Sequence, residues 1–235
     1  MRLQLLTRAA IVAFAPVLAQ STLAWAQTYT FERAFAAGTA ARIDISTHRG
    51  HIVVTASDDG RIVITGTATV RRSGINLPLN AGDLAKGVSD HPPVEVRGTT
   101  LGIRPPSDPL VDRAVTVDYD IRIPPPLPIV AVSDSGDMTI KDHAGPLSVR
   151  TQSGAIDVTV TETGGLTFEA TSDSGAIDVD AGLIDGTTEK TRVRGTVRGG
   201  GAVWQLTTKS GAIGVHAPKA SSINITPRPP NWQTH

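Results

Sequence analysis

Ser172-Asp173-Ser174-Gly175-Ala176-Ile177-Asp178-Val179 is the stretch that decides the fold, because it recurs along the chain. Three similar stretches occupy residues 133–140, 151–158 and 208–215, each with glycine at its fourth position. These glycines, at 136, 154, 175 and 211, are separated by 18, 21 and 36 residues, and 36 is twice 18. A period near 20 residues is typical of stacked repeat units. We expect a degenerate unit at residues 194–197, inside the long interval, and an early one at residues 47–54.

Each repeat contains two short strand-like segments, one after Ser-Gly and a second such as residues 147–150 or 166–169. The recurring glycine permits positive φ or close backbone approach where the chain turns, and the serine before it can form a local hydrogen bond there. The sequence therefore predicts an all-β chain, folded as a β-solenoid, a β-helix-like stack of two-strand repeats of 18–21 residues. A β-sandwich is the alternative, because it also has short strands separated by frequent turns. The predicted core consists of Ile140, Ile156, Val158, Ile177, Val179, Ile213 and Val215, facing Val149, Leu166 and Phe168.

Before the repeats, the chain alternates between strand signals and one region of a different kind. Strand-like runs rich in Val, Ile and Thr occupy residues 42–46, 52–54, 62–64 and 114–123. The proline-rich run at residues 124–128 predicts a corner between two layers. Residues 71–112 contain six prolines, a strand-like segment at 94–97 and a weak helix candidate at 81–87, and we expect an excursion of loops and short strands. Long loops often carry function, so this excursion is a candidate binding region.

The repeats support a family resemblance. Ile123-Pro124, residues 130–133, Ser135-Gly136-Asp137 and the serial Ser-Gly-Ala-Ile-x-Val units resemble the bacterial putative-adhesin β-strand-repeat family over residues 42–215. The resemblance implies a β-helix-like stack. Most members of the family are secreted or envelope proteins, its biochemical function is unknown, and the resemblance implies no catalytic residues. This chain departs from the family pattern in its longer excursion and in the alanines at 155, 176 and 212, where aspartate is common.

The two ends of the chain differ from the middle. Residues 1–26 combine Arg2 and Arg8, an apolar run at 9–19 and Ala24-Trp25-Ala26, which is the pattern of a secretory signal peptide cleaved before Gln27. The apolar run of 11 residues is shorter than the roughly 20 needed to span a bilayer. We expect a β-strand-repeat domain at 27–220, a polar proline-rich tail at 221–235, no membrane span, and a periplasmic or extracellular location, including the cell surface.

The composition excludes several classes of protein. The chain has 235 residues, 22 basic and 22 acidic side chains, no cysteine and only 4% aromatic residues. Without cysteine there is no disulfide scaffold, zinc finger or thiol nucleophile. Balanced charge argues against a nucleic-acid binder, and few aromatics argue against a stacking platform for bases or sugars.

The acidic residues of the repeats are the main candidates for chemistry. Asp157 and Asp178 occupy the same repeat position, and direct stacking would place them about 4.8 Å apart. Such carboxylates suit a calcium ladder or a glycoside hydrolase, whereas the simpler interpretation is a solvated acidic face. His48 and His51 are interpreted as turn residues, and residues 199–201 as a wide turn. We assign no catalytic, cofactor-binding or metal-ligating residue and expect no cofactor.

Two functions remain open. The first is a secreted, non-enzymatic envelope or cell-surface β-repeat protein, an adhesin-like binding or structural module that works through a sheet face or the 71–112 loops. Its partner would be an envelope or surface ligand, protein or glycan, with self-association through the solenoid ends also possible. The alternative is a polysaccharide-active β-helix enzyme.

Overall fold

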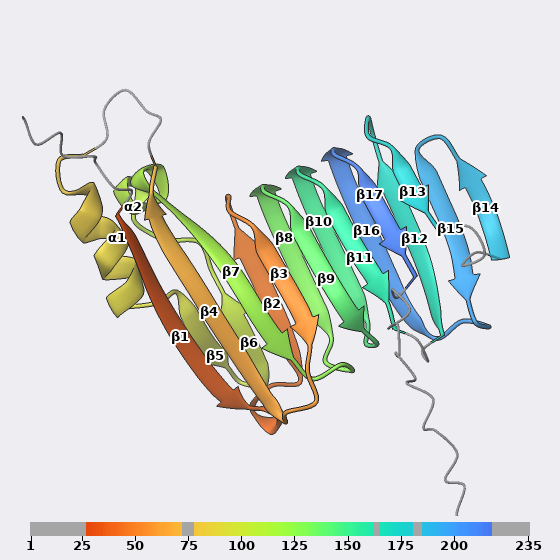
Figure 1. Cartoon of the computed structure of the whole chain (residues 1–235), viewed down its shortest axis with the longest axis horizontal. Coiled ribbons are helices and arrows are strands. Elements are labelled where there is room, and N and C mark those ends of the chain that lie inside the picture. Colours follow the sequence, from red (N-terminus) through yellow and green to blue (C-terminus); the bar gives the residue numbers. More distant parts are fainter. Residues whose placement is uncertain (1–26, 72–77, 162–164, 181–184, 218–235) are drawn as a thin grey trace, which may run out of the picture.

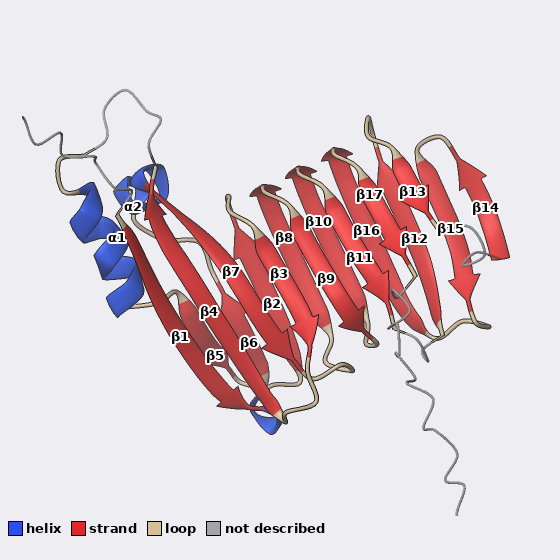
Figure 2. Cartoon of the chain, in the orientation of Figure 1, coloured by secondary structure: helices blue, strands red, loops and turns tan. Residues whose placement is uncertain are grey.

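The computed structural model describes residues 27–71, 78–161, 165–180 and 185–217. Within them the chain is mostly β, as predicted, and its strands form two large sheets (Figures 1 and 2). The eight-stranded sheet has the order β1 (Thr28–Ala36), β4 (Arg61–Val70), β7 (Val115–Ile123), β3 (Ile52–Ala56), β9 (Met138–His143), β11 (Ile156–Val160), β17 (Ile213–His216) and β13 (Ile177–Val179).

The nine-stranded sheet lies against it. Its order is β14 (Asp185–Glu189), β15 (Arg192–Val197), β12 (Leu166–Ser172), β16 (Ala202–Ser210), β10 (Leu147–Ser153), β8 (Ile129–Ser135), β2 (Arg42–Thr47), β6 (Thr100–Ile103) and β5 (Val94–Arg97). The described helices are a short 3-10 turn (Ala37–Thr39), α1 (Ala81–Asp90) and α2 (Pro109–Ala114). None of them is long and apolar enough to cross a membrane.

Five two-strand units build the middle of both sheets. Each unit sends one strand through the nine-stranded sheet and the next through the eight-stranded sheet, and neighbouring units pair in parallel. The four Ser-Gly repeats and the early copy at residues 47–54 each lie in one unit, as predicted. The units are β2–β3, β8–β9, β10–β11, β12–β13 and β16–β17.

The predicted degenerate unit at residues 194–197 is wrong. These residues lie in β15, which pairs antiparallel with both β12 and β14. The long interval between glycines therefore contains a β-hairpin at the edge of the nine-stranded sheet and not a further copy of the repeat. Its length matches two periods because the hairpin and its connections use as many residues as one unit.

The order of the units in space differs from their order along the chain. The last unit, β16–β17, lies between β10–β11 and β12–β13 (Figure 1). Asp157 and Asp178 both pair with Gly214, on opposite sides of β17. The expectation that these carboxylates lie one strand spacing apart is therefore wrong, because a strand with glycine at the equivalent position separates them.

A column of glycines marks the turns of the units. A Cβ added to Gly136, Gly154, Gly211 or Gly175 would collide with the carbonyl oxygen of the preceding glycine in the column, beginning with Gly50. Only Gly50 and Gly136 have positive φ, at 101° and 128°, so close backbone approach is the requirement that the others share. The serine before each glycine donates to a carbonyl of the neighbouring unit, and not within its own turn as predicted; the contacts are Ser135–His48, Ser153–Asp134, Ser210–Gln152 and Ser174–Lys209.

The core lies between the two sheets, as the alternating pattern predicts. Of the ten predicted core residues, all are buried except Ile177 and Val179, which are half-buried. These two belong to β13, which ends the eight-stranded sheet and therefore has a neighbour on one side only. A row of buried hydroxyls crosses the units beside the glycine column, consisting of Thr47, Ser133, Thr151, Thr208 and Ser172.

Trp204 fills the centre of the inserted unit. It is fully buried, and its indole N–H donates to the Gly145 carbonyl at 3.0 Å. The His143 ring stacks on it with centroids 6.4 Å apart, and His143 is only 1% exposed. Burial disfavours the charged imidazolium and lowers the pKa of His143 to about 4.

We predict that Gly154→Ala destabilises the stack by at least about 2 kcal/mol, because a backbone carbonyl must move to admit the new methyl group. Urea unfolding gives the free energy of unfolding. Gly38→Ala is the matched control, because nothing lies within 4 Å of the added Cβ there, and its effect should stay within about 0.5 kcal/mol. Equal effects of the two substitutions would contradict the role of the column.

The buried His143 predicts a loss of stability in mild acid. Between pH 6.5 and about 4, the unfolded chain binds a proton at this imidazole that the folded protein does not, so the free energy of unfolding falls as the pH falls. The loss reaches about 3 kcal/mol and stops growing below the folded pKa. His143→Phe should flatten this part of a pH series of urea unfolding curves, whereas His51→Asn, whose side chain is 64% exposed, should not. Parallel curves for wild type and His143→Phe would refute the prediction.

Candidate binding site

The 71–112 region forms a cavity of about 610 Å³ at the helical end of the two sheets. We call it the end groove. Its volume lies in the range of about 300–1,000 Å³ typical of ligand pockets. Its lining comes from three segments of the chain: α1 and the residue after it, the β5 strand with the prolines before it, and the segment from the end of β6 into α2. The residues are Asp83, Leu84, Gly87, Val88 and His91; Pro92, Pro93, Val94, Glu95 and Arg97; and Arg104, Pro105, Pro106, Ser107, Asp108 and Val111. Of the excursion, the described residues 78–112 hold the predicted strand at Val94–Arg97 as half of a hairpin, and they hold helices where loops were predicted.

Helix α1 forms one wall. Its apolar residues recur at Ala81, Leu84, Ala85 and Val88, the spacing of one helical face. Ala81, Ala85 and Val88 are buried, and the helix packs against β4 and β1. It extends beyond the predicted 81–87 to Asp90, because this packing continues through Val88. On its outer side Lys86 pairs with Asp90 at 2.6 Å, which raises the pKa of Lys86.

The β5–β6 hairpin forms the opposite wall. Gly98 has φ of 59° and Thr99 does not have positive φ, the pattern of a two-residue type II′ turn with glycine first. Glu95 lies between two arginines, at 2.9 Å from Arg97 and 3.7 Å from Arg104. One carboxylate thus faces two guanidinium groups, and this wall carries a net positive charge.

Helix α2 closes one end of the groove with Val111. Asp108 caps the helix by accepting from the Leu110 N–H at 2.8 Å, and Pro109 occupies its first turn. The sequence interpretation missed this helix, although an N-cap aspartate followed by proline is a start signal for helices. At six residues the helix is too short for a clear apolar period.

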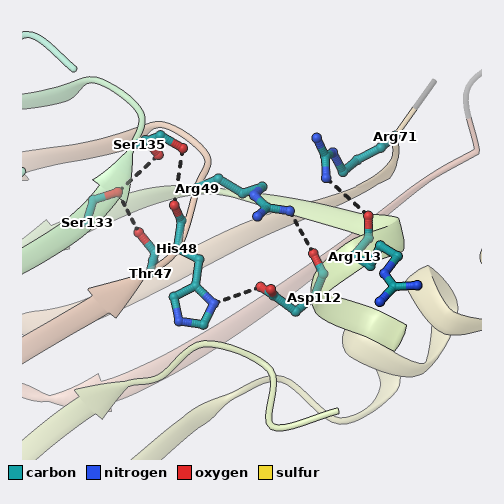
Figure 3. Close-up of polar contacts among 8 residues, drawn as sticks. All are labelled: Thr47, His48, Arg49, Arg71, Asp112, Arg113, Ser133 and Ser135. Atoms are coloured by element: carbon teal, nitrogen blue, oxygen red, sulfur yellow. Dashed lines mark hydrogen bonds and ion pairs between the residues drawn. The ribbon is translucent and has the colours of Figure 1, made fainter. Parts of the chain in front are cut away.

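Polar contacts attach α2 to the first two-strand unit and to the residue after β4 (Figure 3). His48 Nδ1 lies 2.9 Å from an Asp112 carboxylate oxygen, and Arg49 donates to the Asp112 carbonyl at 2.9 Å. Arg71 donates to the Arg113 carbonyl at 3.2 Å. Both histidines singled out in the sequence, His48 and His51, lie in the turn between β2 and β3, as interpreted. His48 therefore fixes one end of the groove to the sheets.

The acidic residues of the repeats make contacts between neighbouring turns. Asp137 accepts from the Ala155 N–H, and Asp134 accepts from Gln152, both at 2.8 Å. The described residues contain no group of three or more acidic or histidine side chains arranged to hold a metal ion. The pairing geometry removes the direct stacking of Asp157 and Asp178 that the calcium ladder requires.

His216 covers the glycine that separates these two carboxylates. Its Nε2 lies 3.6 Å from Asp157 and its Nδ1 lies 3.3 Å from Asp180. A Cβ at Gly214 would meet the imidazole ring, so glycine makes room for it. A hydrogen bond from the Ala217 N–H, together with His216, lowers the pKa of Asp180.

A second hollow of about 430 Å³ lies on the outer face of the nine-stranded sheet, over β12, β15 and β16. Glu169 lies in it, paired with Arg194 at 3.3 Å and with Arg192. Val203 is 54% exposed there.

The chain is similar to one protein family model and to solved structures of two other proteins. No curated protein matches it. A crystal structure of a putative cell adhesion protein from Clostridium sporogenes ATCC 15579 is similar, with 9% identity over 81% of this chain and 100% of that chain, and a TM-score of 0.46. A putative adhesin from Bacteroides fragilis NCTC 9343 has 11% identity over 80% of this chain and 97% of that chain, with a TM-score of 0.30. The family model Toastrack DUF4097 matches residues 57–216, more than half of the chain, and the protein belongs to this family.

Proposed function

We propose that the protein is an exported, non-enzymatic binding module of the bacterial cell envelope or cell surface, and that the end groove is its binding site. The observation that carries this proposal is the groove itself, a largely apolar cavity with charged residues in its lining at one end of the two sheets. The five parallel units, which we interpret as a short two-sided β-solenoid, serve as the scaffold. Function on loops positioned by a rigid scaffold is a common arrangement.

The contacts of the ionisable residues support a non-enzymatic role. Asp118 accepts from the His51 N–H at 2.8 Å and Asp137 accepts from a neighbouring turn, so these carboxylates bond backbone groups. His143 is buried against Trp204. These side chains stabilise turns and the core, so their positions are accounted for by a structural role.

The groove walls support a ligand with both apolar and charged groups. Leu84, Val94 and Val111 are partly buried and line the cavity. Arg97 is 76% exposed, so its guanidinium is accessible to a ligand. Apolar surface supplies affinity, and a few placed charges supply orientation.

The binding proposal predicts that Leu84→Asp in the mature protein weakens retention on isolated cell envelopes by at least tenfold, because a carboxylate enters the apolar α1 wall of the groove. Leu79→Asp is the matched control, since Leu79 is fully exposed and lies outside the lining. Sedimentation of labelled protein with envelopes gives the affinity, and thermal melting of both variants checks that they fold. Unchanged retention of folded Leu84→Asp would place the binding site elsewhere.

The proposed export predicts cleavage of residues 1–26 in a bacterial host. Mass spectrometry of the protein recovered from the periplasm or medium should give Gln27 as the first residue, because Ala24 and Ala26 occupy the specificity positions of a signal-peptidase site. Ala26→Arg should block processing. Retention of the full-length wild-type chain in the cytoplasm would contradict export.

A further inference from the structure

The open edge of a sheet lies in the wall of the end groove. Strand β5 is the last strand of the nine-stranded sheet, and within the described residues it pairs with β6 alone. Val94, Glu95 and Arg97 of this strand line the cavity. We propose that the end groove binds an extended peptide segment of a partner protein, which adds to β5 as a further antiparallel or parallel strand. The proposal rests on the binding function proposed above and names the class of ligand.

The turn of the hairpin determines which backbone groups of β5 are available. A two-residue turn at Gly98 and Thr99 makes Arg97 and Thr100 a hydrogen-bonded pair, and bonded and non-bonded pairs alternate along the ladder. Val96, opposite Leu101, is therefore in a non-bonded pair, and its N–H and C=O point away from β6. Val94 is oriented in the same way, but its N–H already donates to the Pro92 carbonyl at 2.8 Å, so only its C=O can accept a hydrogen bond from an added strand. Three backbone groups thus face the open side, and Val96 is 42% exposed.

The rest of the groove suits an extended chain. Across from β5, helix α1 presents Leu84 and Val88, and α2 adds Val111. Side chains of a strand point alternately to its two sides, so every second residue of an added strand would face these apolar residues of α1 and α2. Peptide recognition between a strand edge and a neighbouring groove uses main-chain bonds for affinity and side-chain contacts for selectivity.

The charges of the groove favour an acidic residue in the peptide. Arg97 and Arg104 share the single carboxylate of Glu95, at 2.9 and 3.7 Å, so the strand wall has a net positive charge. Asp83 and Asp108 lie on the other side, on α1 and at the start of α2. A bound segment that places Asp or Glu beside Arg97 would gain a charge-assisted hydrogen bond. We therefore expect alternating apolar residues with one acidic residue among the polar positions.

The test uses the mature protein and a displayed library of random twelve-residue peptides, from which the best binder is synthesised. Val96→Pro removes the outward N–H, and proline is tolerated at such edge positions because that N–H bonds nothing within the sheet. We expect this substitution to weaken peptide binding at least tenfold, while Val96→Thr, which keeps the N–H, changes it less than about threefold. Isothermal titration gives the affinities, and thermal melting confirms folding of both variants.

N-methylation of the peptide provides an independent measurement on wild-type protein. Methyl groups on the backbone nitrogens that face β5 should abolish binding, and those on the alternate nitrogens should not, because only every second N–H of a strand faces a given neighbour. Peptide binding that is unchanged by N-methylation and by Val96→Pro, but is lost in Leu84→Asp, would overturn strand addition. The proposed binding function of the groove would still hold in that case. Failure to select any peptide would also overturn the peptide proposal, whereas envelope binding unaffected by Leu84→Asp would overturn the groove.

Discussion

Close backbone contact between successive glycines is the constraint on which the two-strand units depend. The glycine of each unit must lie against the carbonyl of the preceding glycine in the column, and no side chain fits between them. Once the turns are in contact, the strands on both sides pair in parallel, and the serine hydroxyls beside the glycines bond across units. Ser-Gly is therefore the part of the repeat that recurs most strictly, while the residues beyond it vary.

The same contact explains how the last unit is held in the middle. Gly211 lies between Gly154 and Gly175, and Trp204, Leu206 and Val215 of this unit are fully buried. Because β12–β13 and the β14–β15 hairpin precede it in the chain, the final unit must enter between strands that were synthesised earlier. Without it, β10 and β12 would have no partner in common, so the last unit joins the end of the stack to its middle. Such non-local pairing is expected to slow folding.

Much of the repeat architecture was predictable from the sequence, because Ser-Gly followed by alternating Ile and Val reports both a turn and a strand. The early copy around Gly50 lacks the serine and was recognisable only from its glycine, which is followed after one residue by Ile52, Val53 and Val54. The spatial order of the units was not predictable, since the turns at Gly154, Gly175 and Gly211 are nearly identical and any of them can stack on another. For the end groove, the sequence predicted only which region of the chain would be involved. Its helices were hard to predict because α1 contains two glycines, which weaken a helix, and α2 is shorter than two turns.

The groove is a consequence of how the sheets end. A stack of parallel strands exposes unpaired backbone groups at both ends, and proteins usually cover or shorten such edges. At one end the β14–β15 hairpin extends the nine-stranded sheet, and its surface carries Glu189 and Lys190. At the other end α1 packs on β4 and β1 of the eight-stranded sheet, while the nine-stranded sheet ends in the four residues of β5. The helix covers one sheet and lies beside the other, whose last strand is only four residues long and has no second partner among the described residues.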